Sequence, residues 1–192
     1  MGDNILELRD ITKLYPGVKA LDHVSISFRR GEVHALVGEN GAGKSTLIKT
    51  VSGAIEPTEG RICVEGREFE ALTPALSREN GIAIVYQEFT LVPVLTAAEN
   101  IFLGEFLRKG IFSCQREMSE LAKKLFQRLN IQMDPDVKVG ELTTGYQQIV
   151  EIAKAVSKNA KILIMDEPSA PLTNREVEAM FQVVETLKAE GV

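Results

Sequence analysis

A glycine-rich run in the first quarter of the chain has the spacing of a phosphate-binding loop. Residues 38–45 fit the pattern GxxxxGK[ST], in which backbone N–H groups curl around phosphate oxygens at the start of a helix. Lys44 is then placed to reach the β- and γ-phosphates, Ser45 to ligate magnesium, and Thr46 to touch the α-phosphate. The loop predicts ATP and Mg²⁺ as cofactors, with nucleotide contacts from Gly38, Glu39, Asn40, Gly41, Ala42, Gly43, Lys44, Ser45 and Thr46.

The alternative is a loop that only happens to be rich in glycine, which at average composition occurs in about one chain of this length in a hundred. The flanking residues favour the functional interpretation. The apolar run 33–37 predicts a strand buried on both faces, and Leu47, Ile48 and Val51 lie on one face of a predicted helix. A strand before the loop and a helix after it are the setting that the motif requires.

A second apolar run, residues 162–165, predicts a buried strand that ends in two carboxylates, Asp166 and Glu167. Ligands bind at the carboxyl ends of strands in parallel α/β sheets. Asp166 is therefore placed to hold magnesium, and Glu167 to orient or deprotonate an attacking water. Alone, this pattern is as readily a solvated strand end, but the phosphate loop upstream makes phosphoryl chemistry the better interpretation.

Other patterns predict the elements that position these residues. Residues 5–38 are β-rich, and short strands are predicted at residues 61–65 and 81–86. From about residue 95 to 159 the pattern becomes helical, and a last helix is predicted at residues 174–190. The two helical stripes are Leu121, Leu125 and Leu129, then Ile149, Ile152, Ala153 and Val156. We expect one α/β domain with a helical insertion.

Bulk properties exclude several classes of protein. The net charge of −5 and the lack of a basic cluster argue against a nucleic-acid partner. Cys63 and Cys114 lie far apart, which gives neither a zinc site nor a disulfide framework. No signal peptide and no apolar run of roughly 18 residues is visible. We therefore expect a cytoplasmic chain that acts at a membrane only through a partner.

Between the two motifs, residues 142–148 read LTTGYQQ, in the place of an LSGGQ-like signature. Together the three motifs resemble the ATP-binding-cassette (ABC) family. The resemblance implies that Thr143, Thr144 and Gly145, which open the predicted helix 147–157, face the γ-phosphate of a nucleotide bound by a second, head-to-tail cassette. The simpler alternative is that this segment is only a helix N-cap.

The resemblance extends over essentially the whole chain. It implies that Tyr15 stacks on adenine, although packing on its own hairpin is an alternative. It also implies that Gln87 meets magnesium and links the nucleotide state to a membrane partner, and that residues 169–173 cross the interface between cassettes. Tyr146 departs from the family's Gln, and Pro171 is also unusual and fixes φ.

Several stretches resemble a narrower group within the family, among them GVKALDHVS, QEFTLVPVLTAAENIFLGE and QQIVEIAKAV. They resemble the N-terminal cassette of bacterial sugar importers of the ribose, galactose and xylose type. This resemblance implies an ATPase at the cytoplasmic face of the cell membrane that energises sugar import. Its implied partners are a second nucleotide-binding cassette, in tandem or as a dimer, a membrane permease and, indirectly, a periplasmic or extracellular sugar-binding protein.

The implied fold is a P-loop NTPase core with an N-terminal antiparallel β subdomain and an inserted helical subdomain. We expect residues 1–90 and 158–192 to form the core and β subdomain, and residues 91–157 the helical subdomain. The family's switch histidine lies beyond Gly191, so we expect the C-terminal part of the core to be missing; His23 is expected at the surface and His34 as a satisfied strand residue. The alternatives are a nucleotide-binding module without turnover and a cassette of translation or DNA repair.

Overall fold

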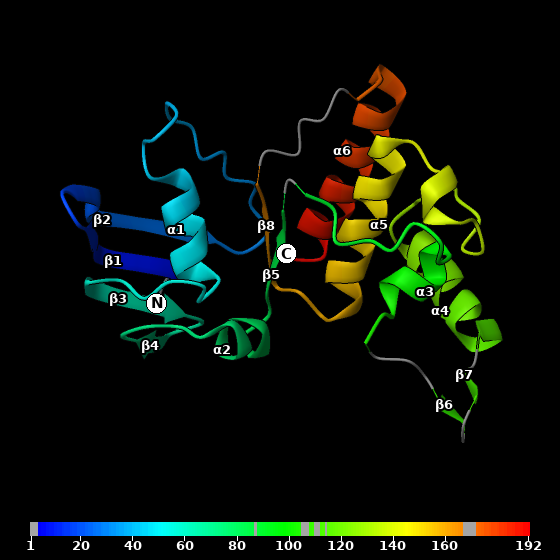
Figure 1. The fold of residues 1–192 in the computed structure, drawn as a ribbon, viewed down its shortest axis with the longest axis horizontal. Helices are drawn as coiled ribbons and strands as arrows, with labels where there is room; N and C mark the ends of the chain where they lie inside the picture. The colour runs from blue at the N-terminus through cyan, green and yellow to red at the C-terminus, as the bar shows by residue number, and fades with distance from the viewer. Residues whose placement is uncertain (1–3, 87, 105–107, 110–111, 114, 167–171) are drawn as a thin grey trace. The chain divides into compact units, whose positions relative to one another are not determined.

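The computed structural model describes residues 4–86, 88–104, 108–109, 112–113, 115–166 and 172–192. These residues form two compact units, each considered by itself below (Figure 1). The first unit comprises residues 1–84, 160–166 and 190–192, and the second comprises residues 85–159 and 167–189. Among the described residues, no helix is both long and apolar enough to cross a membrane.

The first unit contains a four-stranded sheet with the strand order β2-β1-β3-β4. Its strands are antiparallel neighbours, which confirms the predicted antiparallel β subdomain. Apolar residues of β1 stand opposite apolar residues of both neighbours: Leu8 pairs with Ile26 of β2 and with Ile62 of β3. The strand bounds are Asn4–Tyr15 (β1), Val18–Arg29 (β2), Glu59–Val64 (β3) and Arg67–Phe69 (β4).

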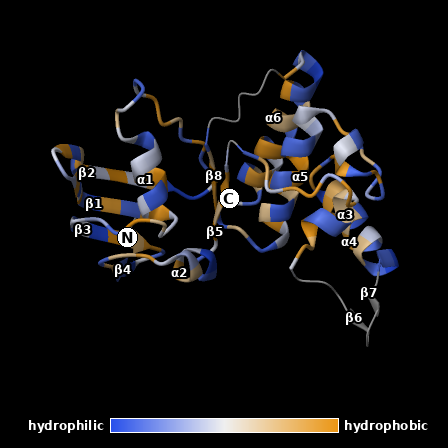
Figure 2. Ribbon diagram, in the orientation of Figure 1, coloured by the Kyte–Doolittle hydropathy of each residue, from blue (hydrophilic) through white to orange (hydrophobic). Residues whose placement is uncertain are grey.

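The sheet forms because apolar and polar residues alternate along its strands, visible as bands on β1 and β2 in Figure 2. The apolar face packs into a core that also receives helix α1 (Lys44–Val51) through Leu47 and Val51. Helix α1 confirms the predicted helix after the loop, and the chain leaves it at Gly53, whose φ is 75°. A short helix, α2 (Pro74–Glu79), follows.

Strands β5 (Ile82–Val85) and β8 (Ile162–Met165) form a two-stranded sheet. The N–H groups of Lys161 and Ile162 both donate to the carbonyl of Gly81, at 2.8 and 3.1 Å. The two strands therefore begin side by side and run in the same direction. Both were predicted from sequence. The β8 residues are half-buried rather than fully covered.

The predicted strand at residues 33–37 is wrong. The segment has no strand assignment, and Val33 and Val37 are 61% and 89% exposed. An apolar strand is stable when neighbouring strands take its backbone hydrogen bonds, and no described strand pairs with this segment. His34 is consequently not a strand residue, although its Nε2 accepts the Arg29 N–H at 3.4 Å. His23 lies at the surface as predicted.

The second unit is mainly helical. Its core is built from one face of each helix, including the predicted stripe Ile149, Ile152, Ala153 and Val156. In the other predicted stripe Leu125 and Leu129 are buried, but Leu121 is 37% exposed because the buried face runs through Met118, Ala122 and Phe126 instead. The bounds are Ala97–Ile101 (α3), Arg108–Lys109 (β6), Phe112–Ser113 (β7), Gln115–Arg128 (α4), Thr144–Ser157 (α5) and Asn174–Ala189 (α6), with a 3-10 turn at Val139–Glu141.

Helix α6 belongs to the same compact unit as α5. The prediction from sequence assigned residues 158–192 to the core. The two helices come close at Gly145, where a side chain of α6 takes the place that a Cβ would need. Because this contact involves the signature residues, it matters for the site described next.

Candidate nucleotide site

The phosphate loop leads directly into α1. Lys44 folds back along the loop, and its Nζ donates to the carbonyls of Gly38 and Glu39 at 2.6 and 3.0 Å. The loop is closed by the Ala42 N–H, which donates to the Glu39 carbonyl at 3.1 Å. A lysine ammonium is thus held over a tight turn of backbone, which is the arrangement that a phosphate chain needs.

Two of the loop glycines are required for different reasons. Gly41 and Gly43 have φ of 84° and 93°, a backbone conformation that side chains disfavour. A Cβ on Gly41 would meet nothing within 4 Å, so its requirement is conformational. A Cβ on Gly43 would lie 2.6 Å from the carbonyl oxygen of Ala20 in β2, so this glycine also lets α1 approach the sheet.

The start of α1 is open to an anion. Its N-cap residue, Gly43, offers no side-chain cap, so the N–H groups of the first turn have no capping acceptor. Ser45 is exposed, and its hydroxyl makes no hydrogen bond to another described residue. Hydroxyl and carboxylate oxygens suit Mg²⁺, so the donor set of Ser45 and Asp166 fits that ion.

The acidic strand end is described in part. Asp166 directly follows β8 and is half-buried. Gln87 and Glu167 lie outside the described residues, as do residues 169–171. The segment after Gln87 is anchored at Thr90, whose N–H donates to the Glu151 carboxylate of α5 at 2.6 Å, as its hydroxyl also does at 2.9 Å.

Tyr15 ends β1 at the tip of the hairpin, opposite Val18. Its side chain is 42% exposed, and Lys13 Nζ lies 5.4 Å from the centre of the ring. The ring is therefore accessible to a planar ligand while Lys13 covers part of it.

The signature residues open α5 in the second unit. Thr143 is the N-cap residue, but its hydroxyl does not cap its own helix. Instead it donates to Oε1 of Glu176 near the start of α6. The other oxygen, Oε2, accepts the Thr173 N–H and hydroxyl, both at 2.7 Å. These bonds, led by the one from Thr143, lower the pKa of Glu176 to about 2.

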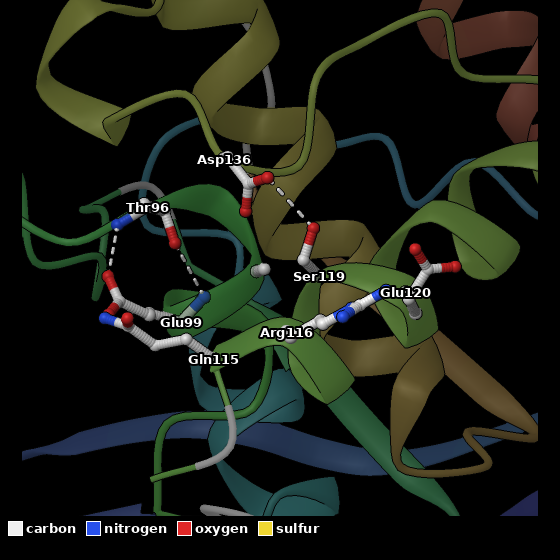
Figure 3. Close-up of a pocket in the computed structure, with 8 residues that line it drawn as sticks. Thr96, Glu99, Gln115, Arg116, Ser119, Glu120 and Asp136 are labelled. Atoms are coloured by element: carbon white, nitrogen blue, oxygen red, sulfur yellow. Dashed lines mark hydrogen bonds between the residues drawn. The ribbon is translucent and has the colours of Figure 1, made fainter.

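A hollow of about 500 Å³ lies elsewhere in the second unit, between α3, the start of α4 and the turn at Asp136 (Figure 3). Glu99 lies at its edge, where its Oε2 accepts the Thr96 N–H at 2.8 Å and its Oε1 accepts Nε2 of Gln115 at 2.8 Å. None of the residues predicted to bind nucleotide lines it. The lining residues are Thr96, Ala98, Glu99, Gln115, Arg116, Ser119, Glu120 and Asp136.

Comparison with known proteins decides the family. The family model described as ABC transporter matches residues 21–170. The chain belongs to the ABC transporter family. The match contains the phosphate loop, the signature and the acidic strand end, so the resemblance inferred from these motifs is confirmed. As an ABC cassette, the chain has a P-loop NTPase core with an antiparallel β subdomain and a helical subdomain.

The curated relatives of this ABC cassette include proteins named as ATP-binding proteins of sugar import. The chain is 47% identical over 194 residues to the xylose import ATP-binding protein XylG of Geobacillus kaustophilus, covering 100% of this chain and 38% of that protein. It is 51% identical over 190 residues to the ribose import ATP-binding protein RbsA 1 of Streptomyces avermitilis, covering 99% of this chain and 36% of that protein. The chain thus spans little more than a third of these relatives.

Solved ABC cassettes share the fold. One is the ADP conformation of an ATP-binding cassette of an ABC transporter, with 34% identity, a TM-score of 0.86, and coverage of 98% of this chain and 78% of that one. Another is a dimeric post-hydrolysis cassette bound to ADP and Pi, with 29% identity, a TM-score of 0.76, and coverage of 96% and 83%. Nucleotide binding is therefore a property of this fold.

Sequence reasoning missed Glu176. A signal was present, because Thr173 and Glu176 have the [ST]-x-x-[DE] spacing of a helix capping box. That spacing predicts the contact with Thr173. It does not predict the contact with Thr143, which lies 33 positions away.

Proposed function

We propose that this ABC cassette binds and hydrolyses ATP and that it energises the import of a sugar through a membrane permease. The phosphate loop carries the proposal: Lys44 is held over a tight backbone turn that runs into an uncapped helix. A sugar is proposed as the transported substrate because the relatives described above are named ribose and xylose import ATP-binding proteins. The sugar-binding protein and the permease, which contact the sugar directly, determine which sugar is selected.

Each predicted residue has a role in this proposal. Lys44 holds the β- and γ-phosphates, and the backbone N–H groups of the loop bind the phosphate oxygens. Ser45, Asp166 and Gln87 would hold magnesium, which would neutralise charge on the phosphates. Glu167 orients the attacking water and accepts its proton. Tyr15 stacks on the adenine from the hairpin tip.

The proposal requires a second cassette. An N-terminal helix turn such as that of residues 143–145 presents N–H groups to an anion, and a dimeric state of a related cassette has been solved with ADP and Pi. We place the assembly at the cytoplasmic face of the cell membrane, on a permease and, through it, a sugar-binding protein outside the membrane. Residues 1–90 and 158–192 are proposed as the core and β subdomain, and residues 91–157 as the helical subdomain.

Thermal unfolding with and without MgATP tests the nucleotide site. Ligand at 100 times its dissociation constant adds about 2.7 kcal/mol, or roughly 5 to 10 °C in a chain of this size. Lys44→Ala is expected to abolish that shift. Lys49→Ala is the matched control, because Lys49 is an exposed residue at the other end of α1. This variant is expected to keep the shift of the unfolding temperature. An equal shift in both variants would refute the assigned phosphate site.

Turnover needs a separate test because a module that holds nucleotide without hydrolysing it shows the same thermal shift. Tyr146, in place of the family's Gln, favours considering that alternative. Phosphate release from MgATP is expected for the parent chain joined to its second cassette, and Glu167→Gln is expected to stop release while MgATP still raises the unfolding temperature. A thermal shift without any phosphate release in the parent would favour the non-hydrolysing module.

A further inference from the structure

Glu65 occupies a turn position that its residue type disfavours. It is the first of the two residues between β3 and β4, which pair next to the turn at Val64 and Arg67. Glu65 and Gly66 have φ of 47° and 81°, and a type I′ turn requires positive φ at both of its central residues. Asn, Asp and Gly favour this conformation, whereas a longer side chain such as that of glutamate does not. The presence of glutamate here is therefore explained by what its side chain contacts.

The Glu65 carboxylate joins two segments that are far apart in the sequence. Its Oε1 accepts a hydrogen bond from Nη2 of Arg30 at 2.5 Å, and its Oε2 accepts one from Nζ of Lys161 at 2.6 Å. Arg30 directly follows β2, and Lys161 directly precedes β8. The hydrogen bond from Lys161, and after it the one from Arg30, lowers the pKa of Glu65. The carboxylate is therefore charged at neutral pH and pairs with both cations.

The contact with Lys161 is part of a larger attachment at the start of β8. The stem of Lys161 lies across Gly81, where an added Cβ would come within 3.0 to 3.2 Å of Cβ, Cγ and Cδ of the lysine. The Gly81 carbonyl also accepts the N–H groups of Lys161 and Ile162. Glu65 extends this attachment to the hairpin of β3 and β4. The start of the strand that leads to Asp166 is thus held through its backbone, the lysine stem and the ammonium group.

Both segments that Glu65 joins lead to predicted magnesium ligands. Beyond Arg30 the chain runs through residues 33–37 to the phosphate loop and Ser45, and β8 runs to Asp166. In the part of the chain that the structure describes, β8 pairs with β5 alone, and no strand pairs with residues 33–37. Strands on both sides therefore do not fix either segment there. Contacts at the start of each segment consequently influence where the two ligand oxygens lie.

We propose that Glu65 is a positioning residue for the magnesium site. By pairing with Arg30 and Lys161, it fixes the segments that lead to the two magnesium ligands. The spacing between the oxygens of Ser45 and Asp166 then depends on this carboxylate. Magnesium demands short contacts in a nearly ideal octahedral geometry, so a small displacement of one ligand weakens its binding. The proposal deepens the proposed function and rests on it.

Glu65→Asn separates this role from a role in folding. Asparagine suits the first position of a type I′ turn, so without ligand the variant is expected to unfold at the parent's temperature or above it. Its amide is uncharged and forms no ion pair with either cation. Calorimetry with a non-hydrolysable ATP analogue, well below the unfolding temperature, is expected to show about threefold weaker binding in the presence of magnesium, which is the size that exposed ion pairs usually contribute. In excess chelator, the affinity for the analogue is expected to match that of the parent.

Two further variants complete the test. Glu68→Gln removes the same charge from the same sheet, where Glu68 pairs with Arg9 of β1, and it is expected to bind the analogue as the parent does. Lys161→Met keeps the stem across Gly81 but removes the ammonium group. It is expected to weaken binding only with magnesium, and its combination with Glu65→Asn is expected to bind no more weakly than Glu65→Asn alone.

The outcomes distinguish this inference from the proposed function. Unchanged binding in Glu65→Asn, or an equal loss with magnesium and with chelator, would overturn the positioning role of Glu65. Multiplying effects of Glu65→Asn and Lys161→Met would show that the two side chains act independently, and would also overturn it. A parent chain that binds the analogue equally well with magnesium and with chelator would instead refute the magnesium site of the proposed function.

Discussion

Two capping boxes in the helical unit differ in what surrounds them. At the start of α3, Thr96 and Glu99 exchange the reciprocal bonds of the motif, with 3.1 Å from the Glu99 N–H to the Thr96 hydroxyl. At the start of α6, Thr173 and Glu176 do the same. In both, one carboxylate oxygen takes part in the cap and the other accepts a hydrogen bond from a second helix. Glu99 accepts it from the Gln115 amide of α4, and Glu176 from the hydroxyl of Thr143, the N-cap residue of α5.

The difference lies in burial and in the neighbour. Glu99 is half-buried at the edge of an open hollow, where water can replace Gln115 (Figure 3). Glu176 is buried against Gly145, where little else can take the place of Thr143. The pKa of both carboxyls is lowered, mainly by the Thr96 backbone N–H for Glu99 and mainly by the Thr143 hydroxyl for Glu176. At Glu99 the four-residue motif therefore acts mainly as a helix cap. At Glu176 it also forms a bridge, meaning a buried contact that joins α6 to α5.

Gly145→Ala should show the largest effect, since it forces a methyl group into the space of the bridging side chain. The new Cβ would lie 2.7 Å from Cβ of Glu176. Such overpacking costs about 1–3 kcal/mol, or roughly 2 to 12 °C in the unfolding temperature. Gly140→Ala is a graded control, because its Cβ would meet Pro93 at the milder distance of 3.1 Å. Equal losses in the two variants, measured by calorimetry, would argue against a special packing of Glu176.

Glu176→Gln should remove a pH dependence of stability. A carboxyl whose pKa is lower in the folded state stabilises the fold above its unfolded value, and this contribution is lost as the pH falls toward the folded value. For Glu176 the window runs from 4.5 down to about 2. The unfolding temperature of Glu176→Gln is expected to fall less steeply than that of the parent across this window. Parallel curves would show that the carboxylate is not held as described.

Much of the fold could be predicted because its elements follow local patterns. The period-two alternation of β1 and β2 and the stripe of α5 are set by residues close in sequence. The phosphate loop is equally local, since eight consecutive residues contain its glycines, lysine and serine. The segment 33–37 was mispredicted because its burial depends on pairing with strands far away in sequence, and no described strand pairs with it.

Only half of the contact that joins Thr173, Glu176 and Thr143 could be predicted. Thr173 and Glu176 are three residues apart, and their types predict a capping box. That Thr143 is the third member depends on how α5 and α6 pack, which no local pattern reports. Gly145 illustrates the same limit: its family role suggests closeness to a nucleotide, whereas in this chain a side chain of α6 explains the missing Cβ.

Glu99→Gln should be milder than Glu176→Gln. Glutamine at the third helical position can still complete a capping box, and water can reach the side that Gln115 leaves. The same acid titration is informative, because the pKa of Glu99 is also lowered and its contribution is also lost as the pH falls below the ordinary carboxyl value. We expect a smaller change of slope than in Glu176→Gln. A larger change of slope would mean that the Glu99 carboxylate contributes more to the pH dependence of stability than the Glu176 carboxylate does.

Gln115→Ala should have the smallest effect of these changes. It deletes the second-helix partner of Glu99, as Thr143→Val deletes that of Glu176, but at an exposed position. Surface changes of this kind usually shift stability by less than about 0.5 kcal/mol, or roughly 1 to 2 °C. The Thr96 N–H, which is the largest single cause of the lowered Glu99 pKa, remains in this variant, so this pKa should rise only in part when followed by NMR. If Gln115→Ala instead destabilised the chain as much as Thr143→Val, both glutamates would be bridges, and burial would not be what distinguishes them.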